Sequence, residues 1–120
     1  MATVALDRES FATTIEDNDV VLVDFWAAWC GPCRMFAPTF EAASQEHPDI
    51  VFGKVDTDDQ RDLAAGLEIA SIPTIMAFRA GYLVFREAGA LSKRQLNSVI
   101  EQVKALDVES LKAQATTPGE

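Results

Sequence analysis

The chain has 120 residues, of which 48% are hydrophobic, and this is enough to form one domain with its own core. Acidic residues outnumber basic residues by 19 to 10, and the net charge of −9 repels phosphate backbones and anionic lipids, so we expect neither a nucleic-acid nor a membrane partner. The N-terminal stretch MATVALDRES lacks the pattern of a secretory signal, and no apolar run reaches the length of a membrane helix, which predicts a cytoplasmic protein.

The first half of the chain predicts strands alternating with helices. A run of β-branched and aromatic residues at 20–27 indicates a strand buried on both faces, interrupted by one acid, Asp24. Pro32 suits the first turn of a helix, whereas Pro38 falls inside the same helical pattern and should kink it. The predicted elements are a strand at 3–6, a helix at 7–17, a strand at 20–27 and a helix from Pro32 to His47.

The second half predicts a strand at 51–56 and a helix at 57–67, with Thr57 or Asp58 as its cap. Strands at 74–79 and 82–86 come next, joined by Ala80-Gly81 in a hairpin. The capping-box spacing of Ser92 and Gln95 opens another helix. Early alternation indicates parallel pairing and the hairpin adds antiparallel strands, so we expect an α/β fold with a mixed central sheet and helices on both faces.

The last residues of the chain lie beyond the expected domain. We expect one domain over residues 1–106 and a C-terminal extension over 107–120. The stretch DVESLKAQA should extend the last helix as far as Leu111, and the polar end, TTPGE at 116–120, should be frayed.

The stretch WCGPC holds both cysteines of the chain, Cys30 and Cys33, and three interpretations compete for them. A structural disulfide here would close a very small loop, where stabilisation is weakest. A zinc site would need further Cys or His ligands, and the chain has one histidine, His47. A redox pair fits best, because Cys30 lies between a strand and a helix N-terminus, where free N–H groups and the helix dipole stabilise a thiolate.

The redox interpretation gives the two cysteines different roles. Cys30, expected to be exposed, attacks a substrate disulfide, and Cys33, one helical turn further and covered, resolves the mixed disulfide. Asp24 is the candidate base for that second step, since burial should raise its pKa toward neutrality. The alternative for Asp24 is an acid paired with Lys54 on the neighbouring strand; the two interpretations are compatible, since a lysine partner would tune the same carboxylate.

Several motifs together resemble the thioredoxin family in its bacterial form over nearly the whole domain. They are VVLVDFWAAWCGPC, Phe36-Ala37-Pro38, Lys54-Val55-Asp56, Ser71-Ile72-Pro73-Thr74, Gly81 and Gly89-Ala90-Leu91-Ser92. The resemblance implies a thioredoxin fold and a general protein dithiol–disulfide oxidoreductase. It implies no bound cofactor, re-reduction by a thioredoxin reductase that draws on NADPH, and disulfide-containing proteins as substrates. Nothing in the sequence demands more than a monomer.

The resemblance also implies roles for individual residues. Pro73 should follow a cis peptide bond and pack beside the cysteines, and Asp58 should pair with Trp26, with a cap role as its competitor. A flat apolar groove for substrate polypeptides should be formed by Trp29, Gly31, Pro32, Ile72, Pro73, Gly89 and Ala90.

Two other functions stay open at this point. A thioredoxin-like oxidant or isomerase usually carries other residues between its cysteines and is exported, whereas this chain has Gly31-Pro32. A binding module with incidental or metal-holding cysteines would not require Cys30, Cys33, Asp24 and Pro73 together.

Overall fold

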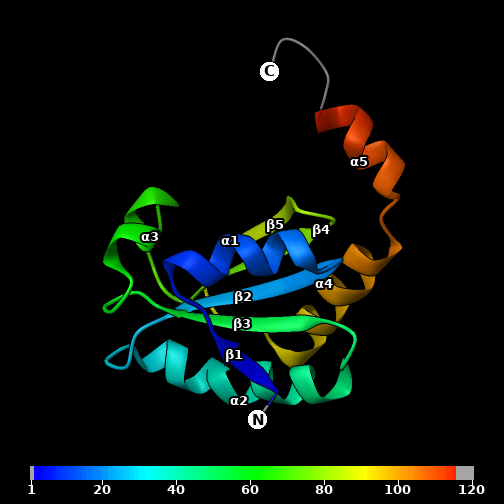
Figure 1. Ribbon diagram of the computed structural model, residues 1–120. Helices are drawn as coiled ribbons and strands as arrows, with labels where there is room; N and C mark the ends of the chain where they lie inside the picture. The colour runs from blue at the N-terminus through cyan, green and yellow to red at the C-terminus, as the bar shows by residue number, and fades with distance from the viewer. Residues whose placement is uncertain (1, 116–120) are drawn as a thin grey trace.

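The computed structural model describes residues 2–115 and contains a five-stranded mixed sheet covered by helices (Figure 1). The strand order is β1-β3-β2-β4-β5; β1 and β2 both run parallel to β3, and β4 runs antiparallel to both β2 and β5. The α/β architecture expected from the sequence is confirmed. In chain order the elements are β1 (Thr3–Ala5), α1 (Arg8–Asp17), β2 (Val20–Trp26), α2 (Gly31–Glu46), β3 (Val51–Asp56), α3 (Arg61–Gly66), β4 (Thr74–Arg79), β5 (Tyr82–Ala88), α4 (Lys93–Ala105) and α5 (Val108–Ala115).

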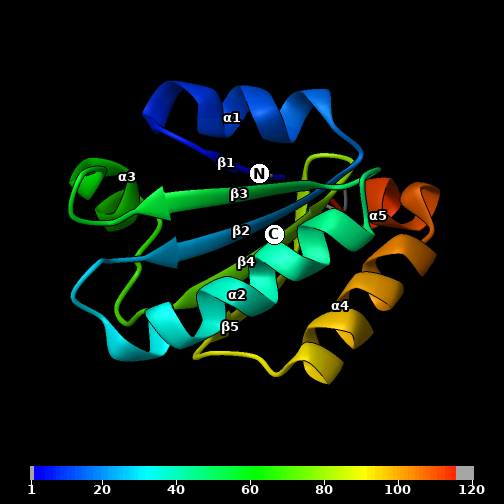
Figure 2. The same cartoon turned by 90° about the horizontal axis from the view of Figure 1, so that it is seen from below.

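Each face of the sheet has its own core. On one face α2 and α4 pack their apolar side chains, among them Phe40 and Ile100, against Leu22 and Ile75 of the central strands. On the other face α1 packs Phe11 against alternate residues of the same strands, and α3 adds Leu63. Figures 1 and 2 show these two layers, with α1 on one side of the sheet and α2 and α4 on the other. The apolar character of β2 on both of its faces, apart from Asp24, is therefore explained by the helices that cover the two faces.

Two helices begin with reciprocal capping boxes, one of which the sequence predicted. Asp7 caps α1 by accepting a hydrogen bond from the Ser10 amide at 2.8 Å, and the Ser10 hydroxyl accepts one from the Asp7 amide in return. Ser92 and Gln95 form the predicted reciprocal box at the start of α4. Helix α2 continues through Pro38 and ends at Glu46, with His47 as its C-cap.

Helix α3 is shorter than the sequence suggested, and the predicted cap is wrong. It begins at Arg61 after Gln60, which makes no side-chain cap, so neither Thr57 nor Asp58 caps it. The preceding residues instead form a turn in which the Asp56 carboxylate accepts a hydrogen bond from the Asp58 amide at 3.0 Å. A local acceptor at Asp56 competes with helix formation, which delays the helix by one turn.

The C-terminal extension is also different from the prediction. The last helix does not run on to Leu111: α4 ends at Ala105, and a separate helix, α5, begins at Val108. Arg79 explains the break, because its guanidinium Nη1 occupies the carbonyl oxygens of Val103, Lys104 and Leu106, which a continuing helix would need for itself. The frayed end expected at 116–120 lies outside the described residues.

The topology brings three loops together at one end of the central strands, called here the cysteine end of the sheet. Strand β2 ends at Trp26, and its neighbour β4 begins at Thr74, which pairs with Phe25 on one side and Ala88 at the end of β5 on the other. The loops that come after Trp26, before Thr74 and after Ala88 therefore lie side by side.

Candidate functional site

Cys30 and Cys33 are joined by a disulfide at the N-terminus of α2, with their Cα atoms 5.2 Å apart. Cys30 is the N-cap of the helix, and its Sγ accepts a hydrogen bond from the Cys33 amide at 3.2 Å. Gly31 and Pro32 form the first turn, where the missing N–H of proline leaves no intrahelical bond unmade. The arrangement aims a helix-terminal N–H at the sulfur of Cys30, where negative charge develops when the disulfide is reduced.

The expectation that Cys30 is exposed is wrong. Only 4% of Cys30 is exposed, little more than the 2% of Cys33. The two cysteines form a small cluster with Ala27, onto which Trp26 and Ile72 pack, and the Ile72 carbonyl oxygen lies 3.7 Å from Cys30 Sγ. The sequence placed Cys30 in a loop, but it could not show that the loop before Pro73 folds over it.

Asp24 is fully buried, and neither carboxylate oxygen has a hydrogen-bonding partner within the described part of the chain. It lies in β2 opposite Ile75, on the face of the sheet that α2 covers. Burial raises the pKa of Asp24 to about 7, against the weaker, lowering effect of the Lys54 charge. A carboxyl group with this pKa exchanges a proton near neutral pH, which is what a general base requires.

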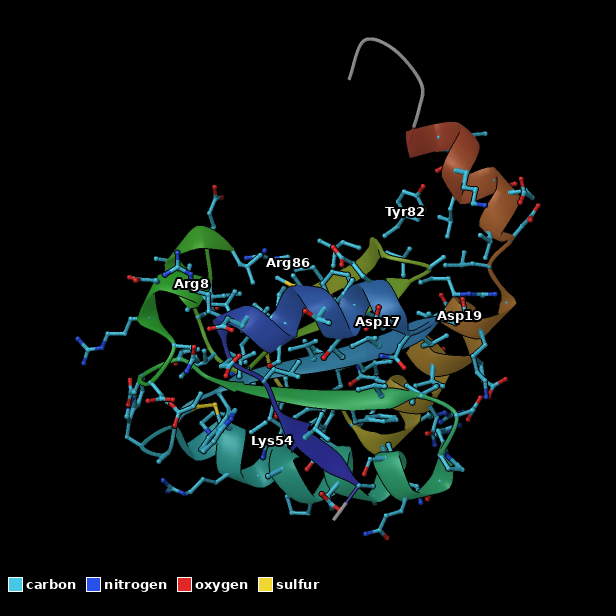
Figure 3. The ribbon with its side chains drawn as sticks, in the orientation of Figure 1. Arg8, Asp17, Asp19, Lys54, Tyr82 and Arg86 are labelled. Atoms are coloured by element: carbon cyan, nitrogen blue, oxygen red, sulfur yellow. A yellow bond between two sulfur atoms is a disulfide. The ribbon has the colours of Figure 1, made fainter. Side chains whose placement is uncertain are left out.

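Lys54 lies directly beside Asp24, on β3, but its ammonium group turns to a different partner. The two residues are in register across the parallel pair of strands, and Figure 3 shows Lys54 on the α2 side of the sheet. Lys54 Nζ lies 4.8 Å from the centroid of the Trp26 ring. The ammonium is therefore held by a cation–π contact and acts on Asp24 through its field.

The expected groove residues surround the cysteine pair. Trp29 is 68% exposed; Pro32, Gly89 and Ala90 are also exposed, Gly31 and Ile72 are half-buried, and Pro73 is buried. The cis peptide bond between Ile72 and Pro73 is confirmed. The Gly89 amide donates to the Pro73 carbonyl at 2.7 Å, with Gly89 in a left-handed conformation at φ 111° that disfavours other residues.

The partner expected for Asp58 is wrong. The Asp58 carboxylate accepts a hydrogen bond from Trp29 Nε1 at 2.9 Å, and the ring of Trp26 faces Lys54 instead. Thr57 is the residue bound to Trp26, because its backbone amide and its hydroxyl both donate to the Trp26 carbonyl oxygen. The sequence could not show which of the two tryptophans, Trp26 or Trp29, pairs with Asp58, since the choice depends on the conformation of the loop after β2.

The sequence analysis missed several residues at the cysteine end of the sheet. A hollow of about 180 Å³ beside the disulfide is lined by Trp29, Thr57, Ile69, Ala70, Ser71 and Ile72. Arg34 donates from Nη1 to the Ala28 carbonyl at 2.9 Å and so fixes the loop before Cys30, and Met35 is 80% exposed on the same helix. A basic residue directly after the second cysteine was the available signal for Arg34; nothing in the sequence marked Ile69 or Ala70.

The structure also bears on metal binding and on membrane insertion. Within residues 2–115 no three His, Cys, Asp or Glu side chains gather in a way that could hold a metal ion. None of the described helices has the length and apolar character to cross a membrane.

Comparison with known proteins agrees with this geometry. The family model described as Thioredoxin matches residues 2–102. The chain is 48% identical over 111 residues to "Putative thioredoxin 2" of Streptomyces coelicolor, covering 92% of this chain and 83% of the relative, and 41% identical over 105 residues to a thioredoxin of Mycobacterium tuberculosis, covering 82% and 90%.

Among solved structures, a mutant thioredoxin from Halobacterium salinarum superposes with a TM-score of 0.80 at 31% identity, covering 88% of this chain and 92% of that one. A cysteine pair bonded at a helix N-terminus, on this fold, supports thiol–disulfide exchange. The chain therefore belongs to the thioredoxin family and is a dithiol–disulfide oxidoreductase.

Proposed function

We propose that this chain is a general protein-disulfide reductase in which Cys30 is the nucleophile and Cys33 the resolving thiol. The observation that carries the assignment is the contact between the Cys33 amide and Cys30 Sγ, since it stabilises negative charge on one sulfur of the pair. Cys33 lies one turn inside the helix and has the lower exposure of the two.

The reaction proceeds by two exchanges. The thiolate of Cys30 attacks one sulfur of the substrate disulfide, forms an S–S bond with it and expels the other sulfur as a thiolate, which takes up a proton. Cys33 then loses its proton and attacks Cys30 Sγ, releasing the second substrate sulfur as a thiol. The substrate gains two electrons and two protons, and the Cys30–Cys33 pair is left as the disulfide seen in the structure.

Asp24 is proposed as the base that accepts the proton of Cys33. Its carboxylate lies buried beneath α2 without a competing hydrogen bond from the described residues, and its pKa of about 7 matches the task at neutral pH. Lys54 limits the rise of that pKa by its charge, while its contact with Trp26 keeps the ammonium from forming a tight ion pair that would hold Asp24 ionised.

The polypeptide carrying the substrate disulfide is proposed to lie across Trp29, Gly31, Pro32, Ile72, Pro73, Gly89 and Ala90. Their position around the disulfide, at the cysteine end of the sheet, supports this role. Trp29 supplies the largest exposed apolar surface there, and its hydrogen bond to Asp58 holds the ring in place before substrate arrives.

The family membership supports the remaining assignments. We propose that the oxidised chain is re-reduced by a thioredoxin reductase that takes electrons from NADPH, so that this chain uses nicotinamide only indirectly. We further propose a cytoplasmic monomer, with the redox domain at residues 1–106 and an extension at 107–120.

Reduction of insulin disulfides with dithiothreitol as electron source tests the proposal. The unmodified protein should turn over well above the dithiothreitol background, and both Cys30→Ser and Cys33→Ser should abolish the gain. Cys33→Ser alone should accumulate a mixed disulfide with insulin through Cys30, detectable by mass. A rate equal to background would overturn the proposal and favour a binding module, for which bound zinc would then be measured.

A further inference from the structure

Two arginines on neighbouring strands each bind the C-terminal carbonyl oxygens of a helix. Arg79, at the end of β4, binds three carbonyl oxygens at the end of α4 from Nη1, at 2.8, 2.9 and 3.1 Å, and forms an ion pair with Asp19. Arg86, in β5, binds the end of α3: Nη1 donates to the Leu67 carbonyl at 2.8 Å and Nη2 to the Glu68 carbonyl at 2.7 Å. A cation at a helix C-terminus is favoured by the exposed carbonyls there.

The two arginines hold helix ends that lead to different places in the fold. Arg79 binds the segment that leads to α5. It is the last residue of β4 and lies at the end of the sheet opposite to the cysteines. The helix end that Arg86 holds leads directly into residues 69–72, which line the hollow beside the disulfide together with Trp29 and Thr57. Figure 3 shows Arg86 next to α3, on the face of the sheet opposite Lys54.

The edge strand β5 and the residue after it therefore hold both ends of this loop. Arg86 fixes the carbonyls of Leu67 and Glu68 at its start, and the Gly89 amide, three residues further along the chain, fixes the Pro73 carbonyl at its end. Between these points the loop brings the Ile72 carbonyl oxygen to 3.7 Å from Cys30 Sγ. Glu68 is in a left-handed conformation at φ 56°, which a non-glycine residue adopts at a cost, and Arg86 binds the carbonyl oxygen of this strained residue.

We propose that Arg86 is a positioning residue that holds the loop of residues 68–73 in the shape that receives a polypeptide, and so sets the affinity for protein disulfides. Planar guanidinium geometry matters here, because two nitrogens bind two successive carbonyl oxygens at once. The inference rests on the proposed function, since it assigns Arg86 a part in the docking of that function's substrate. The chemistry at Cys30 does not involve Arg86.

The test separates docking from chemistry by using two kinds of disulfide. Reduced protein is mixed with increasing concentrations of insulin, and the reaction is stopped with N-ethylmaleimide. The fraction of the protein that has been oxidised is then measured by mass spectrometry. The same experiment is done with the small disulfide 5,5′-dithiobis(2-nitrobenzoate). In Arg86→Gln we expect the half-saturating insulin concentration to rise about three- to tenfold, with the maximal rate within about twofold and the small-disulfide rate unchanged. Arg86→Lys should show a smaller rise, because one ammonium cannot replace the two-pronged contact.

Arg79→Gln is the matched control, because it loses the same kind of helix-end contact away from the site. It should lower thermal stability while leaving both disulfide reactions as they are. An unchanged half-saturating insulin concentration in Arg86→Gln would overturn the inference, as would equal slowing with both disulfides or an equal effect in Arg79→Gln. If Arg86→Gln does not fold, Arg86→Lys decides by the same criteria. Failure of the unmodified protein to reduce insulin overturns the proposed function itself, and with it this inference.

Discussion

Asp24, the proposed base, carries a cost to folding because its carboxyl group is buried. A carboxyl group whose pKa rises from 3.8 to about 7 on folding binds a proton in the folded state that the unfolded chain has released. Stability is therefore highest at low pH with respect to this group, falls as the pH passes from about 4 to 7, and stays reduced above that range. Most of this stabilisation is therefore absent at the pH at which the proposed base would act.

The first prediction concerns that loss of stability. Asp24→Asn removes the titrating group. The free energy of unfolding of this variant minus that of the unmodified protein should therefore increase by about 2–3 kcal/mol from pH 5 to pH 8. Urea unfolding monitored by circular dichroism at both pH values measures it. Gln102→Asn, an exposed substitution that removes no titrating group, is the control and should show a difference that does not change with pH. A gap that shrinks as the pH rises would mean that burial does not raise the pKa of Asp24.

The second prediction concerns the rate of disulfide reduction. Asp24→Asn should reduce insulin about ten- to a hundredfold more slowly at pH 8, because the proton of Cys33 has lost its acceptor. The rate of the unmodified protein divided by that of Asp24→Asn should increase through pH 7 and then become constant, as Asp24 ionises. Single-turnover rates of both proteins, measured from pH 6 to 9, give this ratio. A ratio independent of pH contradicts a role as general base.

At the scale of single residues, sequence could identify the chemistry but not the contacts. Asp24 stood out because it interrupts an apolar strand, and the structure confirms its burial. The predictions for the exposure of Cys30 and the partner of Asp58 were wrong, because both depend on how loops distant in the sequence close over one another. Arg86 carried no signal at all, since its partners are backbone carbonyl oxygens, which every residue has.

At the scale of elements, helix α3 offers the clearest test of local structure. It ends in a Schellman motif: the Ile69 amide binds the Ala64 carbonyl and the Glu68 amide binds the Ala65 carbonyl, each at 3.0 Å. Position 68 is the left-handed residue of that motif, usually glycine. Glu68→Gly should therefore raise the free energy of unfolding by about 0.5–1 kcal/mol in urea titrations. Ala12→Gly, at an exposed position in the middle of α1, should lower it by a similar amount; destabilisation at both positions would contradict the assigned backbone strain.

The element order was predictable because hydrophobic periodicity and caps are local. Ser92 with Gln95 specifies the start of α4 within one turn of chain, and the structure confirms it. The predicted start of α3 and end of α4 were wrong because each is decided by a competing bond, from Asp56 in one case and from Arg79, in a different strand, in the other. Helix boundaries set by such partners cannot be found from helix propensity alone.

At the scale of the whole molecule, the packed layers are complete before α5. The two cores draw their residues from positions up to Val103, and Arg79 fixes the chain as far as the Leu106 carbonyl. Beyond it, Asp107 caps α5 through Glu109 and Ser110, and Figure 1 shows α5 standing away from the sheet. The fold class could be predicted from the order of strands and helices, whereas α5 separates from α4 at the point where Arg79, from a distant strand, binds the backbone.

Removal of residues 107–120 should therefore leave the redox domain intact. We expect the melting temperature to change by less than about 3 °C and insulin reduction to stay within experimental error, because no residue proposed for the site is removed. Truncation after residue 102, which also removes the three carbonyl partners of Arg79 and the core residue Val103, is the contrasting variant and should destabilise the protein. A loss of activity on truncation after residue 106, with the melting temperature unchanged, would assign the extension a part in function.

The cluster of Cys30, Cys33 and Ala27 has Trp26 packed on it, so an indole ring lies next to the reactive sulfurs of this protein. A disulfide accepts an electron from an excited indole far more readily than two thiols do. The ultraviolet emission of the unlabelled protein should accordingly brighten on reduction and dim on oxidation. The molecule thus carries its own optical readout, with which its redox state can be monitored in real time and without a dye.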